Sequence, residues 1–175
     1  SEDAKAYTVA FNIICQLFLG KNNILENYGD DEVLYFKQTL KKVSRERHRM
    51  KAFVRFSKSD DGLFFAVIEP DFNVLPLIAG FFKKRYADQR WLIYDVKRKY
   101  GLLYDKLNVS EVKISPEEKQ ALMADTVISL DEKDEHFQNL WKRYYHSTNI
   151  PARRNMKLHL QHVPKRYWKY LVEKQ

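Results

Sequence analysis

Two runs of residues that alternate between apolar and polar side chains constrain the fold of this chain most strongly. The first run covers residues 47–56 and the second covers 62–73, and a period of two residues is typical of β-strands. The short polar connection between them ends in Asp61-Gly62, which favours a hairpin. Both faces of the second run are apolar, so we expect it to be a central strand covered on both sides.

Ionisable side chains gather at the ends of these two runs. Arg47, His48 and Arg49 begin the first run, and Glu69 and Asp71 end the second. Antiparallel pairing places the start of one strand beside the end of the other, so the sequence predicts a candidate site at this edge of the sheet. One interpretation is an acid/base or metal-binding set made of His48, Glu69 and Asp71. The other is a set of salt bridges across the end of the hairpin.

The remaining patterns predict three helices and three further strands. A mostly buried helix is expected over 3–19, a second helix after the cap Asp30 with a basic distal half, and a third after the cap Asn73. Strands are expected over 91–96, 102–105 and 111–114, joined by short loops as in an antiparallel meander. We therefore predict an α+β domain with an antiparallel sheet of about four to five strands flanked by helices.

The C-terminal part of the chain combines cations with aromatic rings. A helix is expected to start at Ser115-Pro116, and another to cover about 131–146. No acidic residue occurs from 136 to 172, and Lys and Arg there alternate with Trp and Tyr, a combination that favours nucleic acid. The alternative is that Tyr144 and Trp168 only anchor the tail. We expect one domain over 1–175, made of an N-terminal helix and connection (1–29), a core (30–114) and a basic-aromatic helical segment (115–175).

Composition excludes several classes of protein. The formal net charge of +8 favours anionic partners. The single cysteine, Cys15, permits no intrachain disulfide, so we expect a reducing, cytoplasmic location. The longest apolar run, 7–19, is too short to span a bilayer. With five glycines and no phosphate-binding loop, CxxC or HExxH pattern, we expect no cofactor and no metal site.

Four ordered blocks of sequence, 48–56, 69–77, 88–98 and 164–171, resemble a bacterial family known as DNA metabolism proteins, whose domain is of unknown function. The resemblance implies a role in DNA repair or modification beside a radical-SAM protein, and a related domain is fused to some uracil-DNA glycosylases. Members of that family extend further at the N-terminus, which implies that this chain is the C-terminal part of a longer protein.

We therefore hypothesise an accessory domain that binds DNA for a radical-SAM partner and is not itself an enzyme. The alternatives are a glycosylase- or nuclease-like enzyme using His48, Glu69 and Asp71, and a scaffold that docks an acidic protein. The expected nucleic-acid contacts are Arg49, Arg55, Arg85, Lys97, Arg98, Lys165, Arg166, Tyr167 and Trp168.

Overall fold

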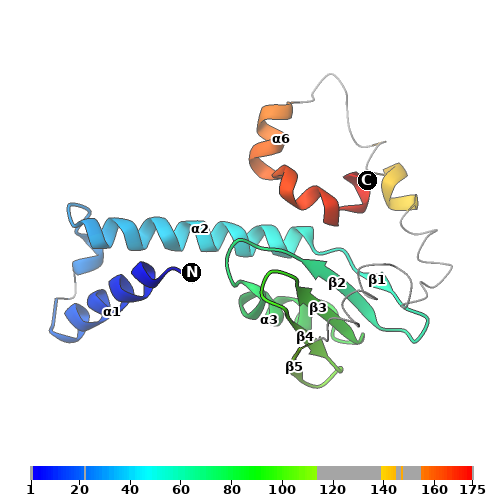
Figure 1. Cartoon of the computed structure of the whole chain (residues 1–175), viewed down its shortest axis with the longest axis horizontal. Helices are drawn as coiled ribbons and strands as arrows, with labels where there is room; N and C mark the ends of the chain where they lie inside the picture. Colours follow the sequence, from blue (N-terminus) through cyan, green and yellow to red (C-terminus); the bar gives the residue numbers. More distant parts are fainter. Residues whose placement is uncertain (1, 22, 114–138, 145–146, 148–154, 175) are drawn as a thin grey trace.

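The computed structural model shows an α+β fold and describes residues 2–21, 23–113, 139–144, 147 and 155–174 (Figure 1). Two helices, α1 and α2, precede a five-stranded sheet. Helix α3 connects strands β2 and β3 of this sheet, and a helical segment follows near the C-terminus. The elements are α1 Ala4–Phe18, η1 Ile24–Glu26, α2 Asp31–Phe53, β1 Ser57–Lys58, β2 Phe64–Ile68, α3 Leu75–Arg85, β3 Trp91–Asp95, β4 Tyr100–Tyr104, β5 Val109–Val112, α6 Met156–His162, η3 Lys165–Tyr170 and η4 Val172–Lys174.

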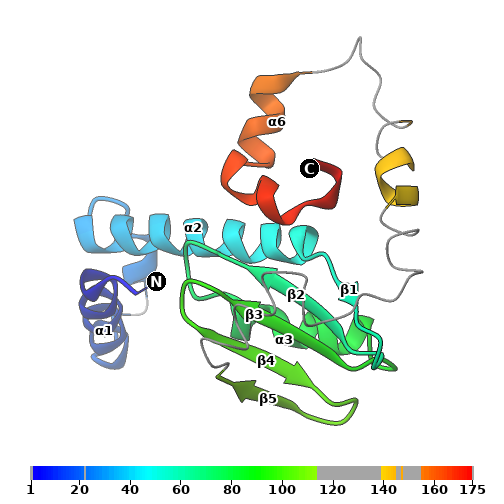
Figure 2. The same ribbon diagram turned by 45° about the vertical axis from the view of Figure 1, so that its right-hand side comes forward.

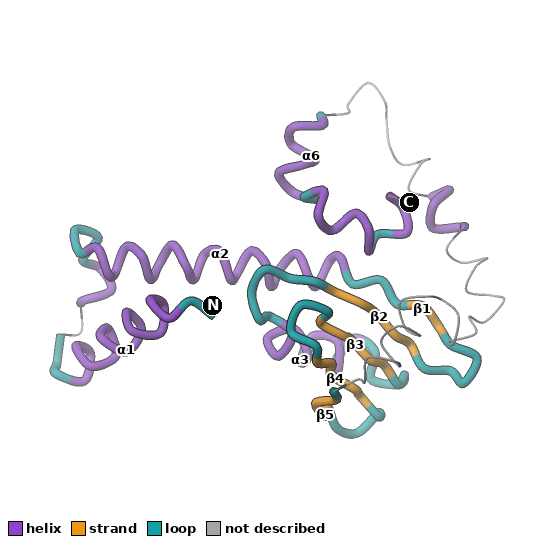
Figure 3. Tube along the Cα trace, in the orientation of Figure 1, coloured by secondary structure: helices purple, strands orange, loops and turns teal. Residues whose placement is uncertain are grey.

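The strands lie in the order of the sequence, from β1 to β5 (Figure 3). The pairs β3·β4 and β4·β5 are antiparallel, as the sequence predicts, and β1 is also antiparallel to β2. The pair β2·β3 is parallel, with Phe64 opposite Trp91. Helix α3 is the crossover connection, and it returns the chain to the end of the sheet at which β2 begins, so that β3 runs in the same direction. The predicted α+β class is confirmed, and the sheet is mixed rather than purely antiparallel.

The prediction of a strand over 47–56 is wrong. Asp30 caps α2 by accepting hydrogen bonds from the backbone N–H groups of residues 32 and 33, and the helix then continues to Phe53. Glu46 and Met50 are buried on one face of α2 together with the half-buried Phe53, at the spacing of three to four residues that a helix requires. This helical spacing prevails over the alternation, and the short β1, Ser57–Lys58, lies in the predicted hairpin connection. The basic residues at 47–49 therefore lie on a helix.

The main core lies between α3, the sheet and the C-terminal half of α2. Ile78 and Phe82 of α3 pack with Trp91 and Ile93 of β3, and Met50 joins them from α2. Every residue of β3 is buried, so this strand is covered on both faces. On β2, Phe65 and Ala66 point to opposite faces and both are buried, as predicted for that run.

Helices α1 and α2 form an arm with a separate, smaller core. Val9 and Ile13 of α1 pack against Ile24 and Val33. The helix predicted over 3–19 is confirmed, but its burial is not, since Phe18 is 88% exposed. The reason is that α1 lies along the N-terminal half of α2 and away from the sheet (Figure 1).

The other predicted elements have mixed outcomes. The strands expected at 91–96, 102–105 and 111–114 correspond to β3, β4 and β5, displaced by one or two residues. Asn73 does not cap α3, because its side-chain oxygen accepts a hydrogen bond from Tyr100 Oη (2.6 Å). The helix start at 115–116 and most of 131–146 lie outside the described residues, although 139–144 are helical. In the described part of the chain, no helix is both long and apolar enough to cross a membrane.

Candidate functional site

A buried glutamate on α2 connects three segments that are far apart in the sequence. Glu46 is only 1% exposed. Its Oε1 accepts hydrogen bonds from Tyr167 Oη (2.5 Å) and from the backbone N–H of Asp71 (2.8 Å). Its Oε2 lies 3.8 Å from Arg49 Nη1 and 3.7 Å from Arg166 Nη2. We call these five residues the Glu46 network.

Tyr167 holds the C-terminal segment in this network. The side chain is buried, with its ring 5.5 Å from that of Phe53. Burial raises the pKa of the phenol, and the hydrogen bond to the Glu46 carboxylate raises it further. Tyr167 Oη also accepts a hydrogen bond from Arg166 Nη2 (2.7 Å). The phenol therefore stays protonated and donates a hydrogen bond to Glu46.

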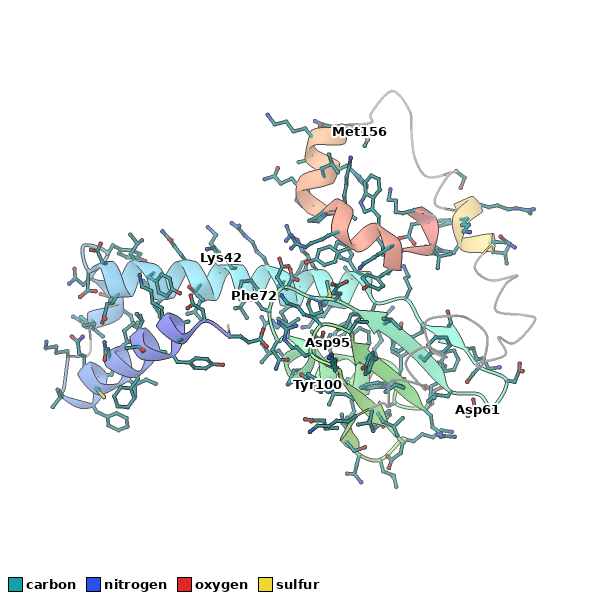
Figure 4. All side chains as sticks on the ribbon, viewed as in Figure 1. Lys42, Asp61, Phe72, Asp95, Tyr100 and Met156 are labelled. Carbon is teal, nitrogen blue, oxygen red and sulfur yellow. The ribbon has the colours of Figure 1, made fainter. Side chains whose placement is uncertain are left out.

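A cavity of about 460 Å³ lies beside this network, where the chain leaves β2. Strands β2 and β3 run parallel, so their carboxyl ends meet at one edge of the sheet, which is where ligands bind in many α/β proteins. Figure 4 shows Asp95 and Phe72 at this end of the sheet. We call the cavity the ion-pair pocket; it is lined by Glu69, Asp71, Lys97, Lys165, Arg166 and Lys169.

Both carboxylates of the ion-pair pocket are matched by cations. Lys169 Nζ (2.5 Å) and Tyr170 Oη (2.7 Å) donate to Glu69 Oε2, and Arg166 Nη2 lies 2.5 Å from Asp71 Oδ2. The hydrogen bond from Lys169, followed by that from Tyr170, holds the pKa of Glu69 below its usual range. Burial, together with the hydrogen bond to Glu69, raises the pKa of Tyr170 to about 12.

The loop after β3 is fixed by Arg98. Its guanidinium donates to Asp95 Oδ2 (2.8 Å), to the carbonyl of Pro70 (3.0 Å) and to that of Asp71 (3.0 Å). Asp95 is fully buried, and its other oxygen accepts the backbone N–H groups of residues 97 and 98. The guanidinium also pairs with Glu2, so the charge of Arg98 is matched within the protein.

A second hollow, of about 650 Å³, lies between the C-terminal half of α2 and the end of α6. Arg49 connects the two walls, because its Nη2 donates to the carbonyl of Gln161 (3.0 Å). None of the described residues that line it is an aspartate or a glutamate. We call it the basic groove; it is lined by Ser44, Arg45, Arg47, His48, Arg49, Lys51, Ala52, Phe53, Gln161, His162 and Val163.

The charges of the basic groove are accessible. Arg45, Arg47 and His48 are exposed. Among the residues that the structure describes, no carboxylate forms an ion pair with Arg45 or Arg47. Closer to the N-terminus of α2, Lys42 projects away from the sheet (Figure 4). This part of α2 therefore presents positive charge that the described protein does not neutralise.

The structure separates the residues that the predicted hairpin would bring together. His48 lines the basic groove, whereas Glu69 and Asp71 line the ion-pair pocket. The expected salt bridges from His48 and Arg49 to these carboxylates are absent from the described residues, because α2 directs Arg49 towards Glu46. Nor does the described part of the chain hold three His, Cys, Asp or Glu side chains arranged to bind a metal ion.

The predicted nucleic-acid contacts lie in several places. Arg49 lines the groove, and Lys97, Lys165 and Arg166 line the pocket. The other predicted contacts lie in neither hollow and interact with the protein itself. Arg55 pairs with Glu173 (2.7 Å), and Arg98 pairs with Asp95 and Glu2. Arg85 lies over the Tyr86 ring, Trp168 Nε1 donates to the carbonyl of Val163 (3.0 Å), and Tyr167 is buried.

Sequence reasoning missed Glu46 and the groove residues at the end of α6, whereas Arg45 belongs to the basic distal half that it predicted for the second helix. One signal was available, since Glu46 is the single acidic residue between positions 33 and 59. A lone carboxylate among cations at the apolar spacing of a helix indicates a buried pairing partner rather than part of a solvated face. No local pattern indicated that Gln161 and His162 would face α2.

A family model described as a domain of unknown function, DUF4130, matches residues 4–173. A search of curated proteins found no match, and neither did a search of solved structures.

Proposed function

The chain belongs to the DUF4130 family, and we propose that it is a nucleic-acid-binding accessory domain in bacterial DNA repair or modification. It holds DNA in the basic groove, in the cytoplasm, while a radical-SAM partner protein supplies the chemistry. The observation that carries the DNA part is the groove itself, whose described lining has four Lys and Arg side chains and no carboxylate. The partner and the repair or modification role rest on the resemblance described above.

The groove matches the requirements of a phosphate backbone. Phosphates are bound by Lys and Arg, and the release of counterions drives the association. A cation that already pairs with a carboxylate must give up that pair first, so Arg98 and Arg166 contribute less than their charge suggests. Arg45 and Arg47 have no such ion pair among the described residues and are the strongest candidates for phosphate contacts.

The geometry does not favour the glycosylase- or nuclease-like alternative. An acid/base set requires its groups to converge within reach of one substrate atom. His48 lies in a different hollow from Glu69 and Asp71, and both carboxylates are engaged with cations.

Titration of the chain against fluorescent DNA at several salt concentrations tests the proposal. We expect binding that weakens steeply with salt while the DNA stays intact. In the double variant Arg45→Ala/Arg47→Ala, the affinity should fall about tenfold or more at low salt. The slope of log affinity against log salt should also become shallower, by about 0.7 to 0.9 for each phosphate that the variant no longer neutralises.

The matched control is Lys106→Ala/Lys113→Ala, which removes the same charge near β5, at the sheet edge far from α2 (Figure 2). Equal losses in both double variants would mean that only net charge matters, and the groove would not be the interface. Tighter binding to polyglutamate than to DNA would support the acidic-protein scaffold instead. Shortened DNA in the same tubes would restore the enzyme hypothesis. Copurification with the radical-SAM protein tests the partner.

A further inference from the structure

The walls of the basic groove limit which form of nucleic acid can enter it. The sheet lies on one side of α2, and α6 with η3 lies on the other (Figures 1 and 2). Gln161, His162 and Val163 face the basic residues of α2 across the hollow. The hydrogen bond from Arg49 to Gln161 ties the two walls together. A ligand that reaches Arg45 and Arg47 from within the groove must therefore fit between α2 and the C-terminal segment.

A duplex read by a helix in its major groove does not meet this condition. An α-helix reads a duplex by entering the major groove, which is about 12 Å wide and is filled by a helix about 10–12 Å across. The side of α2 that carries the groove residues has the end of α6 beside it, so α2 is not free to enter in this way. The hollow of about 650 Å³ has the size of a small-molecule pocket, which suits individual nucleotides.

The groove also offers flat surfaces between its cations. His48 and His162 are exposed rings on opposite walls, and the half-buried Phe53 lies between the groove and Tyr167. Proteins that hold single strands combine a basic channel with rings on which unstacked bases lie, and histidine is among the side chains that stack in this way. In duplex DNA the faces of the bases are covered by their neighbours, so such rings have nothing to stack on.

From the two walls of the groove, the size of the hollow and the exposed rings, we infer that the basic groove binds single-stranded DNA in preference to duplex DNA. The inference rests on the proposed function, since it concerns the strand state that the same groove accepts. Arg45 and Arg47 hold the backbone of the strand, and His48 and His162 stack against its bases.

The test compares one oligonucleotide as a single strand and as a duplex, at the same salt concentration, with the full chain. We expect the single strand to bind about tenfold tighter. The double variant His48→Ala/His162→Ala should lose several-fold of the single-strand affinity and lower the duplex affinity much less. Both side chains are exposed, so folding should be unaffected, and the circular dichroism spectrum checks this.

Each outcome has a distinct meaning. If duplex binds as tightly as the single strand, and still depends on Arg45 and Arg47, the strand preference is overturned while the proposed function stands. If neither form binds at low salt, the proposed function fails as well. If the histidine variant lowers both affinities equally, the rings do not stack on bases and the single-strand inference is overturned.

Discussion

The ion-pair pocket and the basic groove contain similar cations and differ in their carboxylates. The pocket has four Lys and Arg side chains together with Glu69 and Asp71, whereas the described lining of the groove has four such side chains and no carboxylate. The Glu46 network connects them, since Arg49 of the groove and Arg166 of the pocket both approach Glu46 Oε2. Accessible positive charge therefore depends on local pairing, and the net charge of +8 does not locate the interface.

The largest effect on this comparison should come from removing the residue that connects the two regions. Glu46→Ala leaves Tyr167 Oη and the backbone N–H of Asp71 without their acceptor and removes a carboxylate near two arginines. We expect the free energy of unfolding to fall by about 3 kcal/mol, measured by urea denaturation. The C-terminal segment should then no longer dock on α2, and the groove, which lies between the two, should be lost as well.

Two gentler variants separate the causes. Glu46→Gln keeps an oxygen for both hydrogen bonds and removes the negative charge. Tyr167→Phe removes the hydrogen bond to Glu46 and the one from Arg166, at a cost of about 1 kcal/mol each. If Glu46→Ala is as stable as the unmodified chain, the network does not hold the C-terminal segment.

An intermediate effect should come from making the pocket resemble the groove. The double variant Glu69→Gln/Asp71→Asn removes the carboxylate charges that pair with Lys169 and Arg166, and Arg166 still lies 3.7 Å from Glu46 Oε2. We expect the affinity for DNA to rise about threefold at low salt, because the pocket loses two negative charges that repel phosphate. Fluorescence anisotropy measures the change. Unchanged affinity would place the pocket outside the path of the DNA, and loss of a DNA-processing activity would support the enzyme hypothesis.

The smallest effect should be a dependence on pH. For Glu173, burial is the largest influence and opposes ionisation, but the hydrogen bonds from Arg55, the backbone and Trp141, together with the charge of Arg55, outweigh it and lower the pKa. The pKa of Glu69 is also lowered, by Lys169 and Tyr170. A carboxyl with a lowered pKa in the folded state stabilises it fully above its ordinary value of 4.5, and this contribution is lost as the pH falls below it.

We therefore expect the C-terminal segment to loosen below pH 4.5. The exposed pair of Lys169 and Glu69 should contribute about 0.5 kcal/mol. Tryptophan fluorescence during an acid titration follows the loosening through Trp168. In Glu69→Gln the fluorescence change should be smaller, and an identical titration curve would show that this pair does not contribute.

The parts of the fold that the sequence predicts correctly depend on local patterns. Helix α1, helix α3 and strands β3 to β5 follow from periodicity within a few residues, and so does the α+β class. The run at 47–56 misleads because alternation competes with helical spacing there, and burial of Glu46 and Met50 decides the outcome. The parallel pairing of β2 with β3 depends on where α3 returns the chain, which no period in the sequence encodes.

The candidate site is predictable only in part, for a related reason. His48, Glu69 and Asp71 stand out in the sequence as chemically capable residues, but their neighbours come from distant segments. Glu69 binds Lys169, which lies 100 residues later in the chain. Such a pairing depends on the packing of Tyr167 and Leu171, whose burial leaves no signature in the adjacent sequence.

The Glu46 network also has a consequence for the order of folding. The hydrogen bond from Tyr167 to Glu46 closes a loop of 121 residues, and that from Arg49 to Gln161 closes one of 112. Contacts of such high contact order form late, because the entropy of closing a long loop must be overcome before the contact stabilises anything. The sheet and α3 consist of nearer contacts and should fold first. On the ribosome, the groove would be completed only after residues 161–167 have emerged and docked, so the nascent chain folds before it gains its anion-binding surface.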